Sequence, residues 1–202
     1  ADDDGNLRLC ARSDKKVTTS NNMVDWKHNA DFTVFRQKML AGERLLDHCA
    51  TCYTYEELGI ESYRQFETKE WVAKLGITSI EDLDNIDRPY YYELRLGNKC
   101  NLMCRGCSPR SSHLIDREFK QHKIMFPGVP QPKTYADVDR IDISGLDQLS
   151  RVYLTGGDPT VMSQVYKFLE QCIQAQRVDF ELTLGINGQK VSDKFLSLCD
   201  QF

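Results

Sequence analysis

The chain has 202 residues, enough for one large domain or two small ones, and its 41% hydrophobic and 28% charged residues are ordinary for a soluble globular protein. Its net charge of −4 offers no basic surface for nucleic acid, and its apolar runs are too short for a membrane-spanning helix. Residues 1–5 are acidic and polar, unlike a signal peptide, and the chain lacks a starting methionine, so we expect a processed chain or a fragment.

Eight cysteines are an unusual feature of this composition. Disulfide-rich scaffolds are usually small and secreted, whereas clustered cysteine pairs in a chain of this kind more often bind metal. We therefore expect free thiols, some of them metal ligands, in a cytoplasmic protein.

Residues 1–88 are predicted to mix short helices and loops. Residues 5–9 favour a short hairpin strand that leads into Cys10, and Cys49 and Cys52 form a C-x2-C pair further on. Apolar residues also recur at a helical spacing that predicts a core-facing stripe: Phe32, Phe35 and Met39.

Residues 89–202 alternate between strand and helix patterns. The predicted strands are residues 90–96, 151–155 and 178–186. The predicted helices begin at Ser111 or Ser112, at Ser163 and at Ser192. The first of these helices is expected to run to about Met125, before a break at Pro127, Gly128, Pro130 and Pro132. Cys172 and Cys199 lie on apolar helix faces and are expected to be buried core thiols.

This order predicts an α/β fold with parallel strands and helical crossovers. In such sheets the loops that follow the strands gather at the same edge, where ligands bind. We therefore expect the cysteine-rich loop after residue 96, the Gly156-Gly157-Asp158 turn and the Asn187-Gly188 pair to share one rim.

The loop after the first predicted strand contains Cys100, Cys104 and Cys107 in C-x3-C-x2-C spacing. Three thiolates on one loop can hold three irons of a [4Fe–4S] cluster and leave the fourth iron open. An open metal position is typical of a reactive site rather than a structural one.

Together these motifs resemble the radical S-adenosylmethionine enzymes. The cysteine run follows a first strand, residues 156–159 resemble the GGEP segment of that family, and residues 187–188 resemble its "TNG" strand end. The resemblance implies that residues 89–202 form a partial (β/α)6 barrel with about three βα units. About half of the barrel would be missing, so we expect a truncated fragment or completion by another chain.

The resemblance also implies a chemistry and a ligand site. The open iron would bind S-adenosylmethionine, whose reductive cleavage gives a 5′-deoxyadenosyl radical that abstracts hydrogen from a substrate. Gly156 and Gly157 would let backbone approach this ligand, Asp158 would accept from its ammonium group, and Asn187 would reach toward it. Two positions depart from the family: Asp158 replaces a glutamate, and Gly106 stands where an aromatic residue is common.

The first cysteine set, Cys10, Cys49 and Cys52, resembles the auxiliary-cluster modules called SPASM or twitch domains, so residues 1–88 are interpreted as such a region. Those modules usually follow the barrel, whereas this region precedes it. An iron–sulfur cluster, structural zinc and free thiols all remain open. A fourth ligand could be His48, a cysteine outside this chain, or the substrate.

Two functions follow as hypotheses. The first is a radical S-adenosylmethionine enzyme that acts on a peptide, sugar or other small metabolite and takes electrons from a flavodoxin- or ferredoxin-type donor. The alternative is a non-catalytic zinc-binding interaction module, with His113 as the nearest fourth ligand of the second cysteine set. Neither hypothesis includes a nucleic acid or a membrane as partner.

Overall fold

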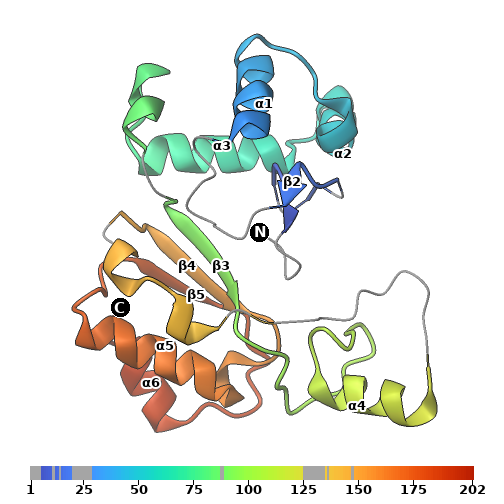
Figure 1. Ribbon diagram of the computed structural model, residues 1–202, viewed down its shortest axis with the longest axis vertical. Coiled ribbons are helices and arrows are strands. Elements are labelled where there is room, and N and C mark those ends of the chain that lie inside the picture. Colours follow the sequence, from blue (N-terminus) through green and yellow to red (C-terminus); the bar gives the residue numbers. More distant parts are fainter. Residues whose placement is uncertain are drawn as a thin grey trace. The chain divides into compact units, whose positions relative to one another are not determined.

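The computed structural model describes residues 6–10, 12–13, 15–19, 29–86, 89–124, 135, 137–146 and 148–202. The chain divides into two compact units, residues 1–87 and residues 88–202. Within the described ranges the fold is mixed α/β, with six α-helices and a small, open, three-stranded parallel sheet (Figure 1).

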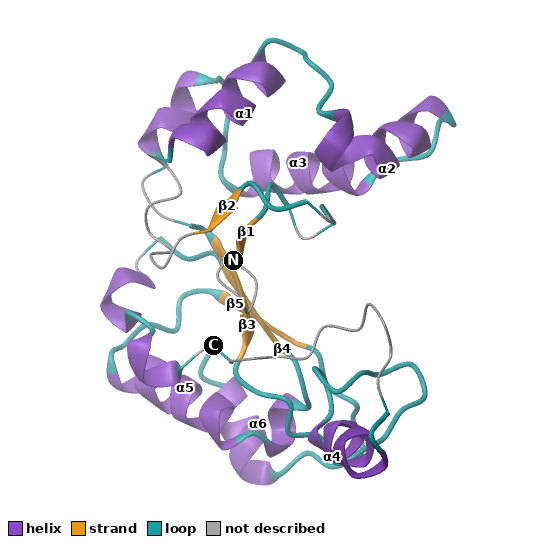
Figure 2. Cartoon of the chain, turned by 45° about the vertical axis from the view of Figure 1, so that its right-hand side comes forward, coloured by secondary structure: helices purple, strands orange, loops and turns teal. Residues whose placement is uncertain are grey.

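The N-terminal unit is mainly helical (Figure 2). Its β1 (Asn6–Leu7) and β2 (Thr18–Thr19) pair as a short antiparallel hairpin. The helices are α1 (Ala30–Leu40), α2 (Leu46–Glu57) and α3 (Tyr63–Lys74), followed by the 3-10 helix η2 (Glu81–Asn85). Asn29 caps α1, because its side chain accepts from the first free backbone N–H groups of that helix.

The predicted core stripe on α1 is wrong. None of the residues of α1 is buried, and Met39 is 46% exposed. The helical spacing of Phe32, Phe35 and Met39 identifies a helix but not a partner for its face. Among the described residues of this unit, the only buried hydrophobic side chains are Leu45 and Cys52. The described part of this unit therefore contains no apolar core large enough to cover α1.

The sheet of the C-terminal unit has the order β3-β4-β5, with both pairs of strands parallel. These strands are β3 (Tyr91–Arg95), β4 (Arg151–Thr155) and β5 (Glu181–Leu184). They confirm the predicted strands and their parallel arrangement, although β5 is shorter than residues 178–186. The register aligns Arg151, the first residue of β4, with Glu181. Residues 178–180 therefore precede the start of β4 and have no β4 residue with which to pair.

Helices connect these strands, as the alternating pattern predicts. α4 (His113–His122) lies between β3 and β4, α5 (Ser163–Gln174) lies between β4 and β5, and α6 (Asp193–Cys199) follows β5. Short 3-10 helices lie at η3 (Val138–Arg140), η4 (Ile143–Leu146) and η5 (Pro159–Val161). α4 ends before Lys123, which adopts a left-handed conformation (φ 53°). Met125 and the expected break at residues 127–132 lie outside the described residues.

The core of this unit lies between the sheet and the helices α5 and α6, which run side by side in Figure 1. Val152 and Leu154 of β4 and Phe168 of α5 are fully buried, and Phe195 of α6 is 1% exposed. Cys172 is fully buried among them, as predicted, and Cys199 is half-buried against the same core. None of the helices in the described part of the chain has the length and apolar character needed to cross a bilayer.

Candidate functional site

The cysteine-containing loop begins where β3 ends and is held there by the turn that follows β4. The backbone N–H of Gly157 donates to the carbonyl of Gly97 over 3.0 Å, and that of Asp158 donates to the carbonyl of Lys99 over 2.8 Å. Two backbone hydrogen bonds thus fix the start of the loop against the neighbouring strand end.

Glycine is required in this turn because the two backbones lie so close together. A Cβ on Gly156 would lie 2.5 Å from the carbonyl oxygen of Gly97, and the φ of Gly156 is +115°. A Cβ on Gly157 would lie 2.6 Å from the carbonyl carbon of Asn98 and would also meet the carbonyl of Lys99. The observed close approach is therefore between backbone and backbone, whereas approach to a ligand stays a prediction.

Asp158 is only 1% exposed and binds groups of its own chain. Its Oδ1 accepts from the backbone N–H and the hydroxyl of Thr160, over 2.9 and 2.6 Å, which caps η5. Its Oδ2 accepts from the backbone N–H of Asn187 over 3.2 Å. The carboxylate therefore joins the end of β4 to the end of β5, and its role as an acceptor for a ligand ammonium stays a prediction.

Asn187, which follows β5, contacts the cysteine loop directly. Its Nδ2 donates to Oδ1 of Asn101 over 2.7 Å and lies 3.8 Å from Sγ of Cys100. Its Oδ1 accepts from the backbone N–H of Gln189, and Gly188 has a φ of +70°. The loops after all three parallel strands therefore meet at one edge of the sheet.

The second half of the cysteine loop is fastened to the first half. The backbone N–H of His113 donates to the carbonyl of Asn98 over 2.8 Å, and the side-chain amide of Asn98 donates to the carbonyl of Pro109 over 3.0 Å. The hydroxyl of Ser112, a residue only 1% exposed, donates to the carbonyl of Leu102 over 2.9 Å. The sequence predicted that Ser111 or Ser112 caps this helix. Ser112 does precede α4, but its side chain makes no capping bond and instead ties the loop together.

Cys100 is half-buried, while Cys104 and Cys107 are exposed, and all three are free thiols. Burial raises the pKa of Cys107 above its ordinary value, and negative charge on Cys104 and then on Cys100 raises this pKa further. Cys107 therefore lies close enough to the other two thiols to be affected by their charge as thiolates. The three thiols do not converge on a point, because the described residues include no group of three or more His, Cys, Asp or Glu side chains arranged to hold a metal ion.

The hydrogen bond of His113 opposes its use as a metal ligand at this loop. The backbone N–H of Cys100 donates to Nδ1 of His113 over 3.2 Å, so Nδ1 is the unprotonated nitrogen. In a neutral imidazole the proton is then on Nε2, which has no lone pair to offer. His113 instead positions the backbone beside Cys100.

The N-terminal cysteines lie in a second cluster. Cys49 and Cys52 are three residues apart on α2 and share one side of that helix, and Cys52 is 8% exposed. Burial raises the pKa of Cys49, and negative charges on Cys10 and Cys52 raise it further, whereas the guanidinium of Arg64 lowers it. Cys49 is thus a neighbour of both other thiols of this unit.

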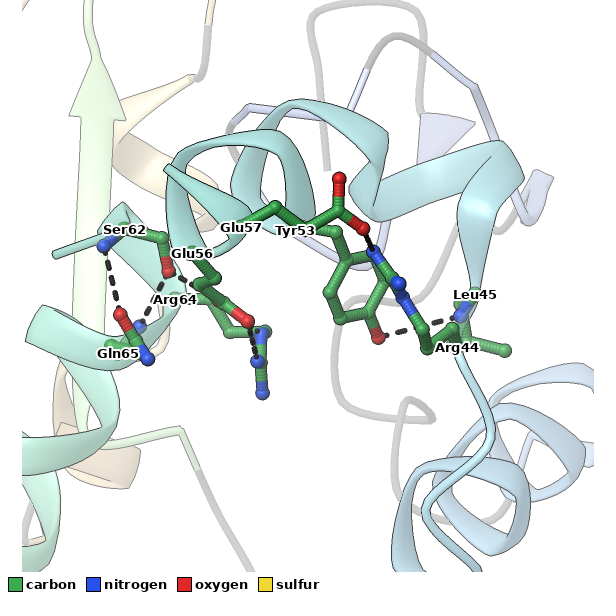
Figure 3. A network of polar contacts seen from close by, with 8 residues as sticks. All are labelled: Arg44, Leu45, Tyr53, Glu56, Glu57, Ser62, Arg64 and Gln65. Atoms are coloured by element: carbon green, nitrogen blue, oxygen red, sulfur yellow. Dashed lines mark hydrogen bonds and ion pairs between the residues drawn. The ribbon is translucent and has the colours of Figure 1, made fainter. Parts of the chain in front are cut away.

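A network of polar contacts joins α2 to the start of α3 (Figure 3). Glu56 accepts from Arg64 over 2.6 Å and 3.2 Å and from the hydroxyl of Ser62 over 2.6 Å. Two guanidinium groups lie over the ring of Tyr53, that of Arg44 at 4.5 Å and that of Arg64 at 5.1 Å from the ring centroid. Exposed ion pairs each contribute about 0–1 kcal/mol, so this network orients the cysteine-bearing helix more than it stabilises the unit.

A cavity of about 430 Å³ lies beside the start of the cysteine loop. It is lined by residues 96–99, by residues 162–164 at the start of α5, and by Tyr135, Asp137 and Val138. A larger groove of about 710 Å³ lies between α2 and α3 of the other unit, along Ile60, Arg64 and Val72. Of these two, the smaller cavity adjoins the strand-end loops.

In comparisons with protein families, curated proteins and solved structures, nothing matches this chain. What the protein does must therefore be inferred from its own residues and their arrangement.

Proposed function

We propose that this chain carries part of a radical S-adenosylmethionine enzyme, with Cys100, Cys104 and Cys107 as the thiolate ligands of a [4Fe–4S] cluster. The observation that best supports this proposal is the meeting of three strand-end loops at one edge of a parallel sheet, where Asn187 lies 3.8 Å from Sγ of Cys100. Ligands of parallel α/β sheets bind at this edge.

The donor chemistry of the loop fits such a cluster. Three free thiols lie on one loop, two of them exposed, and soft thiolate ligands favour iron–sulfur clusters or zinc. When bound, the cluster with S-adenosylmethionine supplies the one-electron cleavage of the sulfonium bond that leads to abstraction of a substrate hydrogen. No general base is needed from the protein for that step.

In this proposal the residues of the chain would hold the cysteine loop in position and bind the small ligand beside it. The backbone bonds from Gly157 and Asp158 fix the first half of the loop, and the amide of Asn187 holds Asn101 beside Cys100. The 430 Å³ cavity next to residues 96–99 offers room for part of a small ligand. The substrate class in this proposal is a peptide or a small metabolite, and the reductant is a flavodoxin- or ferredoxin-type protein.

The proposed architecture is one half of a (β/α)6 barrel. Among the described strands of this sheet, β3 and β5 each pair with β4 alone, so both outer edges of the sheet have backbone groups available for further strands. Three further βα units would complete the barrel. The N-terminal cysteines would hold an auxiliary iron–sulfur cluster in the same proposal.

The alternative is a structural zinc module without catalytic activity. A structural zinc site needs four ligands, and the tautomer of His113 that Cys100 imposes removes the nearest candidate for the fourth. This favours a centre with an open position at the cysteine loop.

The test is anaerobic reconstitution of the chain with iron and sulfide. Iron quantitation would give about four irons per chain for one cluster and about eight for two. Electron paramagnetic resonance of the reduced protein, with and without S-adenosylmethionine, would report ligand binding at the open iron. Cys104→Ala is the test variant, and Cys199→Ala, a thiol of α6 packed against the core, is its control.

We expect Cys104→Ala to lose one cluster and the spectral change caused by S-adenosylmethionine. Cys199→Ala should keep that cluster and that spectral change. Tightly bound zinc without iron uptake would refute the proposal in favour of the zinc module. Equal iron content in the two variants would refute the assignment of the loop.

A further inference from the structure

His48 lies on the same face of α2 as the two cysteines of that helix. At 100° per residue, His48, Cys52 and Cys49 fall within an arc of about 100°, with Cys52 between the other two. His48 and Cys52 are four residues apart, the spacing at which side chains on a helix are neighbours. An imidazole and two thiols are therefore presented side by side.

The hydrogen bond of His48 determines which ring nitrogen carries the proton. The hydroxyl of Ser13 lies 3.2 Å from Nδ1 of His48 and also 3.2 Å from the carbonyl oxygen of Lys15. A hydroxyl has one proton, and the carbonyl can only accept, so both contacts are satisfied only when Ser13 donates to Lys15 and accepts from Nδ1–H of His48. Ser13 is 1% exposed, so an unsatisfied polar group there would be costly.

This tautomer leaves the lone pair on Nε2 of His48. It is the opposite of the arrangement at His113, where the backbone N–H of Cys100 occupies the lone pair of Nδ1. A histidine that binds metal through one nitrogen usually donates its other N–H to an oxygen acceptor, which fixes the ring. Ser13 supplies such an acceptor for His48.

Ser13 also links His48 to the third cysteine. Its backbone N–H donates to the carbonyl of Cys10 over 3.2 Å, so the hairpin turn that holds Cys10 is bonded to the His48 ring through one residue. The ring is further held by the edge of Phe35, with centroids 4.9 Å apart. The backbone of Cys10, the ring of His48 and the helix that carries Cys49 and Cys52 are thus connected within the N-terminal unit.

We propose that His48, through Nε2, is the fourth protein ligand of the metal centre held by Cys10, Cys49 and Cys52. The proposal rests on the proposed metal site at these cysteines. It requires the side chains to turn toward a common point, since the described residues contain no converged set. Such a centre is closed: all four positions are taken by the protein, so it serves folding or electron transfer and does not bind substrate.

The packing of the unit gives this centre a structural purpose. The only buried hydrophobic side chains among its described residues are Leu45 and Cys52, and none of the residues of α1 or α3 is buried. The free energy of binding a metal through side chains that come together only in the folded state adds to the stability of such a unit. A metal held by the hairpin turn and α2 would connect the two.

The experiment uses zinc as the probe and the full chain carrying Cys100→Ala, Cys104→Ala and Cys107→Ala, which removes the loop site. X-ray absorption should then show three sulfurs at about 2.3 Å and one imidazole nitrogen at about 2.0 Å. In this background, His48→Cys should give four sulfurs, which keeps the test valid even if His48→Ala does not fold. His122→Ala, an exposed histidine at the end of α4, is the matched control and should leave the site unchanged.

Competition titration with a chelator should show zinc affinity at least 10-fold lower in His48→Ala. Ser13→Ala, which removes the acceptor for Nδ1–H, should lower it about 10- to 100-fold. An unchanged affinity in His48→Ala, a His48→Cys spectrum with three sulfurs, or no zinc binding at all would each overturn the proposal. Because the loop cysteines are absent, a failure of the radical chemistry would leave these results unaffected, and the two proposals fail separately.

Discussion

Replacing Gly157 with alanine tests whether the turn after β4 holds the cysteine loop in place. A Cβ at this position would lie 2.6 Å from the carbonyl carbon of Asn98 and would meet the carbonyl of Lys99. If the loop stays, the overpacking costs about 1–3 kcal/mol. If the loop moves away, the bonds from Gly157 and Asp158 are lost at about 1 kcal/mol each. In either case the free energy of unfolding of the C-terminal unit falls by about 2 kcal/mol.

The assay is urea unfolding of the full chain followed by far-ultraviolet circular dichroism. With a denaturant dependence of about 1–3 kcal/mol/M, a loss of about 2 kcal/mol lowers the midpoint of the C-terminal unit by about 1 M. Both tryptophans of the chain, Trp26 and Trp71, lie within residues 1–87. Their fluorescence therefore follows the N-terminal unit, whose midpoint we expect to stay unchanged.

Gly106→Ala is the matched control because it changes a glycine in the same loop where a Cβ would meet nothing within 4 Å. We expect its unfolding midpoint to equal that of the unmodified chain. If Gly157→Ala and Gly106→Ala unfold at the same urea concentration, the turn does not hold the loop and the steric reasoning fails.

In the core, Phe168→Ala should lower the free energy of unfolding by about 3–5 kcal/mol. Leu196→Ala, at a residue 51% exposed, should change it by about 0.5 kcal/mol or less. Equal urea midpoints for the two variants would contradict the assignment of Phe168 to the core. The hydrogen bonds from Arg64, and then from Ser62, lower the pKa of Glu56 in the folded chain. The ionised carboxylate therefore stabilises the N-terminal unit at pH values above its unfolded pKa of about 4.3. This contribution is lost as the pH falls through the lower, folded pKa. In Glu56→Gln, the free energy of unfolding, followed by tryptophan fluorescence, should therefore fall less steeply with pH below about pH 4.5 than in the unmodified chain. Equal slopes in the two chains would count against the pairing of Glu56 with Arg64. Burial raises the pKa of Cys172 to about 12, so its thiol should not react with iodoacetamide at pH 8 until the C-terminal unit unfolds. Peptide mapping that finds Cys172 labelled in the folded chain would refute its burial.

The strands and helices of the C-terminal half were predictable because local pattern and global fold agree there. The predicted strand at residues 151–155 has the same bounds as β4, and Ser192 caps α6 by accepting from the backbone N–H of Phe195, as its position predicted. The length of β5 was not predictable, since it depends on where the partner strand begins. The exposure of α1 was equally hidden, because a helical repeat does not reveal whether anything covers it.

At the candidate site, sequence order was enough to place three motifs after three parallel strands. The contacts among them were beyond reach, because no periodicity says that the hydroxyl of Ser112 meets the carbonyl of Leu102. The opposite proton positions of His48 and His113 were hidden for the same reason, since each depends on a single partner distant in sequence. These pairings, more than the cysteine spacing, distinguish the two clusters.

The way the cysteine loop is fastened has a consequence for cleavage by trypsin. Arg105 and Gly106 are exposed at the tip of the loop, between Cys104 and Cys107, whereas the bonds from Asn98 and Ser112 join its two halves closer to the sheet. A nick after Arg105 should therefore leave two pieces that remain associated as one folded body. A metal bound by all three thiols would bridge the cut, so the nicked pieces would separate in denaturant only after the metal is removed.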